Sequence, residues 1–387
     1  VGHSHWISSG VREGQIYQRV REVVPTVVNV HVPMSGCGVR HVYIQLRKTM
    51  EGQGRAALLA ALNSHPSVKH AFVFDHDTDI FDEKEVASER TVIISEREGS
   101  ENEPMFRLGE AVQQYAFRVH SYHHEIIGDM ADLRIITRDD LYAHYRRYYV
   151  PNNAVLAIAG DFETKSMLKR IKELFERIPK GATPPRLARP EPEQKGELRF
   201  SLEGPGETCF VQLAYHFPNA TDPDYLPLQV LDSLLNGASG LSNKTSRLYR
   251  ALIDKGYAVD ASGWSDASID PCLYSITITT HPKRKPEEAI AVVDAEIKKL
   301  QDELVNHDEI KRAVKQARAV FAYGSEDITH QAFWMGYTAM FSTYDWFTTY
   351  LTKLARVTPQ DIQRVARKYF QPKNRVIGIY IPKGKGG

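Results

Sequence analysis

The densest group of potential metal ligands in this sequence is a short run of imidazoles beside one carboxylate. His120, His123 and His124 precede Glu125 in the segment His-Ser-Tyr-His-His-Glu. Imidazole nitrogens and carboxylates are zinc ligands, but at least three of them must converge on one ion. His120 and His123 point the same way only if this segment is helical. We therefore interpret the run as surface or loop-packing residues, with a metal site as the alternative.

A second group of potential ligands lies further upstream. Asp75, Asp77, Asp79 and Asp82 begin with the Asp-x-Asp-x-Asp spacing that opens a calcium-binding loop. The glycine at the sixth position of such a loop and its closing glutamate are missing from this stretch. We therefore interpret these aspartates as an acidic turn at the end of a strand.

The bulk composition excludes several classes of protein. The 387 residues are 42% hydrophobic and 25% charged, as in ordinary globular proteins, and the length suggests about two or three domains. Lys and Arg (49) nearly balance Asp and Glu (48), so no overall field attracts nucleic acid or an anionic membrane. No apolar run approaches the roughly 18 residues of a membrane span.

The N-terminus and the cysteines leave the compartment unknown. The first residues, VGHSHWISSG, show neither an initiating methionine nor a signal-peptide pattern, so we expect a fragment or a processed form. The sequence has three cysteines, an odd number, and they lie far apart: Cys37, Cys209 and Cys272. This spacing favours buried or incidental thiols over a disulfide framework.

An internal repeat indicates which elements of secondary structure the chain contains and how they divide into domains. Residues 134–161 and 355–382 align at a constant offset of 221 positions. Each copy predicts a Thr-capped helix, a Pro-Asn turn and a buried strand. A repeat of this length indicates two tandem domains of one fold rather than a solenoid. The matched pairs include Thr137 and Thr358, Asp140 and Asp361, Tyr148 and Tyr369, Pro151 and Pro372, and Asn153 and Asn374.

Residues 1–178 divide into two segments that differ in their predicted secondary structure. Residues 1–86 predict a β-β-α-β fragment, and residues 87–178 are mainly helical but include a strand at Ala154–Ala159. The helix expected at Lys165–Ile178 is amphipathic, with an apolar stripe that faces a core. The fragment's expected elements are strands at Val27–Val32, His41–Leu46 and Lys69–Phe74 and a helix at Gly54–Asn63. The stripe comprises Met167, Leu168, Ile171, Leu174, Phe175 and Ile178.

A linker at residues 179–195 leads to a second domain at residues 196–387. The linker holds five prolines, which remove amide donors and stiffen the chain. Strands and helices are segregated along the second domain, which predicts the α+β class. We therefore expect tandem homologous α+β domains, the first copy truncated and preceded by a short α/β segment. The elements expected after the linker are strands at Leu198–Leu202, Cys209–Phe217 and Tyr274–Thr279 and helices at Tyr225–Leu235, Ser246–Asp254 and Pro286–Leu304.

From about residue 87 onward the chain resembles the pitrilysin/insulinase-type zinc metallopeptidases, the inverzincins. The similar segments are ERTVIISEREGSENEP, HSYHHEIIGD, DLYAHYRRYYVPNNAVLAIAGDF and SNKTSRLYRALIDKGYAVD. The resemblance implies two homologous α+β domains that pack like a clam shell. It also implies a zinc site on the first domain and a second domain that helps to hold an extended peptide.

The sequence contains only part of the zinc site that this resemblance implies. The family's His-x-x-Glu-His helix supplies two zinc ligands and the general base, and a downstream carboxylate completes the ligand set. By resemblance that carboxylate is Glu96, and Glu89 is its supporting acid. None of the fifteen histidines begins the motif, which the family spacing places near Ile16–Val20. We therefore expect weak zinc binding and no peptide cleavage by the chain alone.

Two residues of the second domain match the family's substrate-side pair. Arg250 and Tyr257 correspond to an Arg and a Tyr that reach the substrate and the tetrahedral intermediate. A guanidinium fork can hold a peptide carbonyl or carboxylate, and a phenol can donate to a developing oxyanion. The alternative is an arginine at a helix end and a packed tyrosine.

Residues 1–86 resemble a different family, the C-terminal part of the UbiD-type decarboxylases that use prenylated FMN. The similarity runs through VPTVVNVHVP and HVYIQLRKTMEGQGRAALLAALNSHPSVKHAFVFDHDTDIFDEKEV. This segment does not include that family's flavin-binding domain. Prenyl-FMN is therefore not expected here.

These resemblances leave three functions open. The first is an insulinase-family endopeptidase-like protein that keeps the substrate side of the site and takes peptides or unfolded polypeptides. The second is a noncatalytic peptide-binding subunit, in a homodimer or in a heterodimer with a catalytic partner. The third is a decarboxylase fragment or a chimeric reading frame joined near Val86 and Ala87. Zinc content and flavin absorbance distinguish them.

Overall fold

The computed structural model describes residues 81–186, 189–237 and 244–384, together with the backbone of three earlier strands. Among these residues, no helix combines the length and the apolar character that crossing a membrane requires. The three earlier strands are β1 (Val27–His31), β2 (His41–Leu46) and β3 (His70–Phe74).

The first of two compact units comprises residues 1–92 and 135–145. Its strands form a sheet in the order β1-β2-β3, in which β1 is antiparallel and β3 parallel to β2. These strands confirm the expected ones to within a residue at each end. The helix expected at Gly54–Asn63, the thiol of Cys37 and the aspartates before residue 81 lie outside the described residues.

Helices account for most of residues 81–178. Asp82, the last aspartate of the acidic group, accepts a hydrogen bond from the Lys84 amide at 2.9 Å at the start of the first of these helices. This contact gives Asp82 a helix-capping role. The helices are α3 (Glu83–Glu101), α4 (Pro104–Ala116), α5 (Met130–Ile135), α6 (Arg138–Tyr148) and α7 (Thr164–Phe175).

The second compact unit, residues 93–134 and 146–387, contains a five-stranded sheet. Its order is β4-β8-β5-β7-β6. The β4 and β8 strands run parallel, whereas the other neighbours are antiparallel, so the sheet is mixed. Its strands are β4 (Leu198–Pro205), β5 (Phe210–Phe217), β6 (Ala258–Trp264), β7 (Cys272–Thr280) and β8 (Arg375–Lys383).

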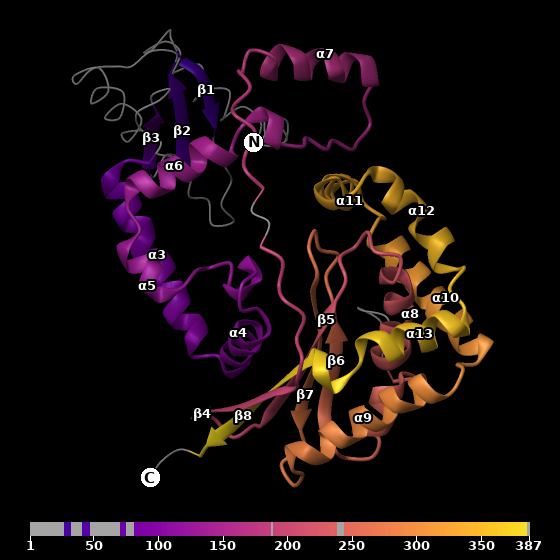
Figure 1. The fold of residues 1–387 in the computed structure, drawn as a ribbon. Coiled ribbons are helices and arrows are strands. Elements are labelled where there is room, and N and C mark those ends of the chain that lie inside the picture. Colours follow the sequence, from indigo (N-terminus) through magenta and orange to yellow (C-terminus); the bar gives the residue numbers. More distant parts are fainter. Residues whose placement is uncertain are drawn as a thin grey trace. The chain divides into compact units, whose positions relative to one another are not determined.

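Three helices pack on one face of this sheet, and further helices cover them (Figure 1). α8, α9 and α13 form the inner layer, and α10 and α12 pack against α8. The helix expected at Ser246–Asp254 includes a π-helical turn at Tyr249–Ile253. The α+β class is therefore confirmed. These helices are α8 (Tyr225–Asn236), α9 (Pro286–Asp302), α10 (His307–Tyr323), α11 (Ile328–Phe341), α12 (Tyr344–Leu354) and α13 (Pro359–Tyr369).

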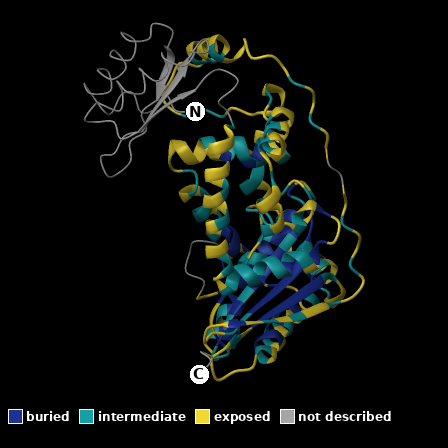
Figure 2. Ribbon diagram, turned by 90° about the vertical axis from the view of Figure 1, so that its left-hand side faces the viewer, coloured by how far each residue is buried: buried dark blue, intermediate teal, exposed yellow. Residues whose placement is uncertain are grey.

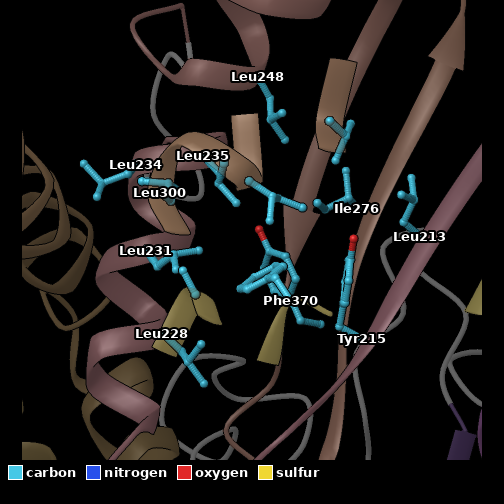
Figure 3. Close-up of a cluster of buried hydrophobic side chains, with 14 of the residues drawn as sticks. Leu213, Tyr215, Leu228, Leu231, Leu234, Leu235, Leu248, Ile276, Leu300 and Phe370 are labelled. Carbon is cyan, nitrogen blue, oxygen red and sulfur yellow. The ribbon is translucent and has the colours of Figure 1, made fainter. Parts of the chain in front are cut away.

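The main hydrophobic core lies between the sheet and this inner layer. Alternate residues of each strand point to one face, so Leu213 and Tyr215 of β5 join Ile276 of β7 in this core. Leucines of α8 and the ring of Phe370 close over them (Figure 3). The central strands are accordingly the most buried part of the fold, as the dark blue ribbon in Figure 2 shows.

Helix α4 covers the opposite face of the same sheet. Leu108 and Val112 are fully buried and form a second core with Val376 and Tyr380 of β8. The close approach depends on Gly378, where a Cβ atom would lie 2.8 Å from a methyl carbon of Leu108. Residues before the linker thus contribute to the core of the sheet that follows it.

The two copies of the internal repeat share their local geometry. The Thr137 hydroxyl donates to Asp140 and the Thr358 hydroxyl donates to Asp361, both at 2.6 Å. After each helix a short 3-10 turn follows, Pro151–Asn153 in the first copy and Pro372–Asn374 in the second. The predicted cap and turn are therefore confirmed in both copies.

The copies differ after this turn. Arg375–Lys383 forms β8, whereas the strand expected at Ala154–Ala159 is not formed. Val155 is 62% exposed, but its counterpart Val376 is fully buried. The prediction of a buried strand in the first copy was wrong, because a strand needs a neighbouring strand to satisfy its amides.

The α7 stripe also differs from its expectation. The helix forms at Thr164–Phe175, but none of its residues is buried. Leu168 is 52% exposed and Phe175 is 48% exposed. The helical period was predicted correctly and the core-facing role was not, because the described part of the first copy offers α7 no sheet to cover.

A pair of leucine substitutions measures this difference between α4 and α7. We expect Leu108→Ala to lower the free energy of unfolding by about 2–5 kcal/mol, because it leaves a cavity under a fully buried side chain. Leu168→Ala, the matched control on the exposed stripe, should change it by less than about 0.5 kcal/mol. Urea unfolding measures both, and equal losses would contradict the assignment of α4 and α7.

The linker is anchored at its C-terminal end. A carboxylate oxygen of Glu191 accepts the backbone amides of Arg118, Val119 and His120 at 3.0, 2.8 and 3.0 Å. The Gln194 side chain donates to the carbonyl of Arg375 at 2.7 Å. The linker therefore continues into the fold from Glu191 onward.

Limited proteolysis should detect this anchor. With a protease of low specificity, we expect the earliest cuts between residues 179 and 190, before Glu191, because anchored backbone resists the local opening that cleavage requires. Mass spectrometry of the first fragments gives the positions. Early cuts within Gln212–Leu235, with the linker still intact, would be the opposite result.

Candidate functional site

The two carboxylates that the zinc resemblance singles out lie on α3, and both are exposed. The residue after Glu96, Arg97, is 5% exposed and forms an ion pair with Glu110 of α4 at 2.6 Å. Glu89 lies two turns before Glu96 on the same helix. No three His, Cys, Asp or Glu side chains of the described residues are grouped so that they could hold a metal ion.

The three histidines of the 120–124 segment contact three different partners. His120 is 7% exposed, accepts a hydrogen bond from the Tyr122 amide at 3.1 Å and lies 3.5 Å from a carboxylate oxygen of Asp270. His123 contacts the carbonyl of Phe117 at 2.6 Å. His124 contacts Asp129 at 2.9 Å. These are the contacts of loop-packing residues, although His120 is more deeply buried than a surface loop implies.

A cavity of about 800 Å³ lies beside His120. It is bounded by the end of α4, residues 189–194 of the linker, the end of β5 and the end of α13. Its lining carries both signs of charge, which suits a ligand with several polar groups. The titratable and charged lining residues are His120, Arg186, Arg189, Glu191, Glu193, His216, Asp270, Lys368, Tyr369 and Lys373.

The charges of this cavity are fixed by burial and by hydrogen bonds. Burial lowers the pKa of His216, so its ring is neutral near neutral pH. Burial works against the ionisation of Glu191, but three backbone amides outweigh it and lower the pKa of that carboxyl. Lys368 is held by Asp224 at 2.7 Å. The arrangement can orient a polar ligand.

Sequence reasoning missed this cavity because its walls come from segments far apart in the chain. The one local signal was the pair of carboxylates, Glu191 and Glu193, inside a proline-rich linker. Acidic residues in a linker are ordinarily solvated, so this signal has little weight without the fold.

Arg250 and Tyr257 lie on either side of the turn that leads into β6. Arg250 is exposed within the π-helical turn Tyr249–Ile253. Tyr257 is half-buried, its amide donates to the Leu252 carbonyl at 2.8 Å, and the guanidinium of Arg284 lies 4.6 Å from its ring centre. The structure therefore places Arg250 in the π-helical turn and Tyr257 directly before β6, where Arg284 packs on its ring.

Comparison with known proteins gives two separate matches. Residues 136–317 match the model described as the peptidase M16 inactive domain, and residues 5–91 match the 3-octaprenyl-4-hydroxybenzoate carboxy-lyase C-terminal domain. The zinc protease PqqE of Helicobacter pylori is 25% identical over 75% of this chain and 65% of its own length. Anhydromevalonate phosphate decarboxylase of Methanothermobacter thermautotrophicus is 40% identical over 22% of this chain and 21% of its own length.

Solved structures show the same fold. The peptidase M16 inactive domain from Pseudomonas fluorescens has a TM-score of 0.70 at 16% identity, over 92% of this chain and 98% of that one. A chain of complex III2 from Candida albicans has a TM-score of 0.63 at 12% identity, over 86% of this chain and 74% of that one.

The mixed five-stranded sheet is thus the sheet of M16 inactive-domain structures. This chain spans about two thirds of the length of the curated zinc protease and about a fifth of the decarboxylase. Residues 136–317 therefore resemble the inactive domain of M16 peptidases, within a similarity to a zinc protease that extends over 75% of the chain, and the N-terminal segment resembles the UbiD C-terminal domain.

Proposed function

We propose that this chain is a polypeptide-binding, noncatalytic component of an M16-type zinc endopeptidase, in which another chain supplies the zinc-binding helix. The observation that carries the proposal is the contrast between the two repeat copies. The second copy ends in β8, an interior strand of a five-stranded sheet, whereas Ala154–Ala159 of the first copy is assigned to no strand. Tandem homologous domains, the first one truncated, account for this contrast.

The described residues do not fit a zinc ion. The Glu96 side chain is exposed, and the nearest ordered ion pair on its helix is formed by Arg97. A single carboxylate cannot complete the set of three protein ligands that a catalytic zinc requires. Within the proposal, Glu96 is the one ligand that this chain would contribute, Glu89 supports it, and a partner supplies two imidazoles.

The substrate side of the proposal rests on Arg250 and Tyr257. An exposed guanidinium can hold a peptide carbonyl or carboxylate by two parallel hydrogen bonds. The Tyr257 hydroxyl, held in place by the packing of Arg284 on its ring, can donate to an oxyanion that develops on the substrate. The ligand is an extended peptide or an unfolded polypeptide.

Assembly with another chain is consistent with the relatives. A chain with this fold occurs in complex III2 of Candida albicans, and the beta subunit of a mitochondrial-processing peptidase is 23% identical over 76% of this chain. We propose a heterodimer with a catalytic subunit, with a homodimer as the alternative. In the heterodimer the catalytic partner would provide the His-x-x-Glu-His helix, which a second copy of this chain lacks.

A binding and cleavage assay tests this function. The full chain should bind a fluorescent, extended peptide, leave it intact after addition of zinc, and retain zinc below one ion per chain by metal analysis. Arg250→Ala should weaken the binding by about tenfold, because it removes a charge-assisted contact. Arg312→Ala, an exposed arginine on α10, is the matched control and should bind normally. One zinc per chain with chelator-sensitive cleavage would refute the proposal.

The second candidate function is prenyl-FMN-dependent decarboxylation. It is favoured by the match of residues 5–91 to a decarboxylase C-terminal domain. The matched segment corresponds to only 21% of the length of the archaeal enzyme. A flavin absorbance band that copurifies with the chain would support this candidate, and we expect none.

A further inference from the structure

A second cavity, of about 470 Å³, lies among the helices that cover the sheet. Its walls come from residues 265–267 and from α8, α10, α11 and α12, of which α10 and α12 contact α8 and α11 contacts α12 (Figure 1). Eight of the twenty lining residues are aromatic, and the volume suits a small ligand or one large side chain. The principal rings are Tyr225, Phe321, Trp334, Tyr337, Trp346 and Tyr350.

The polar atoms of three rings are already engaged by the backbone. The indole nitrogens of Trp346 and Trp334 donate to the carbonyls of Ala220 and Gly324, both at 3.0 Å. The hydroxyl of Tyr337 donates to the carbonyl of Ala267 at 2.9 Å. These rings are therefore held in position by their donors, and the rings of Trp334 and Tyr337 also stack on those of Phe347 and Phe333.

The charged side chains of the cavity are all of one sign. Asp232 and Asp266 line it, and none of its described lining residues is a lysine, arginine or histidine. One oxygen of Asp232 accepts hydrogen bonds from Asn236 at 2.7 Å and from the Tyr274 hydroxyl at 2.8 Å, which fixes the carboxylate. Two carboxylates facing aromatic walls with no protein cation among the described lining leave the negative charge uncompensated.

From this geometry we propose that the cavity binds an organic cation. The alkyl part of an ammonium or guanidinium group would lie against the aromatic rings, and its charge would face Asp232. Aromatic faces attract such cations through their quadrupole, most strongly when the site is shielded from water. The cationic group can belong to a free amine or to a basic side chain of a peptide. The proposal is independent of zinc and of the proposed peptidase role.

The titration of the two carboxylates is consistent with this site. Burial raises the pKa of Asp232 to about 6, against the hydrogen bonds from Tyr274 and Asn236, and burial also raises the pKa of Asp266. A bound cation favours the ionised carboxylates, so affinity should rise between about pH 5 and pH 8. Six other groups among the described residues interact electrostatically with these carboxylates; the pKa of each is raised, which keeps these groups neutral in that range. They are Tyr122, Tyr225, Cys272, Tyr274, Tyr337 and Tyr350.

Calorimetric titration of the full chain with a matched pair of probes tests the proposal. Choline should bind at least about tenfold more tightly than its neutral isostere, in which a tert-butyl group replaces the trimethylammonium. Asp232→Asn should remove this preference. Asp302→Asn, which changes the same charge on the exposed side of α9, should keep it. Equal binding of both probes, or binding of neither, overturns the proposal.

A second variant protects the test from a folding defect. If Asp232→Asn alters the circular dichroism spectrum, Trp334→Leu removes one aromatic wall instead and should weaken choline binding severalfold in a folded protein. Unchanged affinity in folded Trp334→Leu would also overturn the proposal. A blocked lysine peptide and its norleucine analogue then identify the source of the cation. Tighter binding of the lysine peptide than of choline assigns the site to a side chain, and the reverse assigns it to a free amine.

Discussion

Replacing Arg375 with alanine should lower the free energy of unfolding by about 3 kcal/mol. The guanidinium is 6% exposed and contacts Glu197 at 2.6 Å, the Tyr215 hydroxyl at 3.1 Å and the carboxylate of Asp294. Its removal leaves the Asp294 carboxylate and the buried phenol without this donor and leaves Glu197 with Arg199 as its remaining ion-pair partner. Burial raises the pKa of Tyr215 to about 12, so its hydroxyl stays protonated. A buried hydroxyl that loses its hydrogen-bond partner destabilises the fold. Urea unfolding followed by circular dichroism measures the loss.

Arg199 provides the matched control for this substitution. It contacts the same carboxylate, Glu197, at 2.6 Å, but it is 47% exposed. Because exposed ion pairs are screened by water, Arg199→Ala should cost less than about 1 kcal/mol. Arg375→Lys keeps the charge without the planar fork and should fall between the two. Equal urea midpoints for Arg199→Ala and Arg375→Ala would show that the buried contacts do not anchor β8.

The first copy of the repeat lacks the residues that fix β8 in its sheet. At the offset of 221 positions, Ala154 stands where the second copy has Arg375, and Ala157 stands where it has Gly378. Ala154 has no charged group that could form the buried ion pairs of Arg375. The methyl group of Ala157 occupies, in the first copy, the space that Gly378 leaves in the second for the close approach of α4. The differences between the copies therefore coincide with the residues that carry tertiary contacts in the second copy.

Local interactions could be predicted from the sequence, and this explains which expectations are confirmed. The Thr358–Asp361 cap and the Pro372–Asn374 turn depend on residues within a few positions of one another, so their pattern is visible in the chain. Four of the five strands of the second domain, β4, β5, β7 and β8, were also predicted from their apolar residues, whereas β6 was not. The strand at Ala154–Ala159 has the same pattern, but its formation depends on neighbouring strands that no local pattern reveals.

The candidate site was predictable only where a motif is local. The sequence identified Arg250 and Tyr257 by a short resemblance; the structure places Arg250 in the π-helical turn Tyr249–Ile253 and Tyr257 directly before β6, and their role in binding stays a prediction. Both cavities escaped prediction because their walls come from several segments that are distant in the chain. In the aromatic cavity, Trp334 and Trp346 also resemble ordinary core residues, since nothing in the sequence shows that Asp232 lies beside them.

Amide exchange should differ by more than about a thousandfold between the two copies of the repeat. The amides of Val376–Ile379 lie in a strand with neighbours on both sides, β4 and β5, so they exchange only when the sheet opens. The segment from Val155 to Ile158 is assigned to no strand, and Val155 and Leu156 are more than half exposed. Its amides should therefore exchange at nearly the rate of an unfolded chain.

Hydrogen exchange at two matched pairs of residues is the most direct test of the claim that only the second copy completes its sheet. Val155 matches Val376 and Ile158 matches Ile379, so side-chain type contributes little to any difference in rate. The account predicts rapid exchange at Val155 and Ile158 and strong protection at Val376 and Ile379 in the same sample. Equal protection of both pairs would contradict it, because it would mean that the first copy also has a paired strand and a sheet of its own.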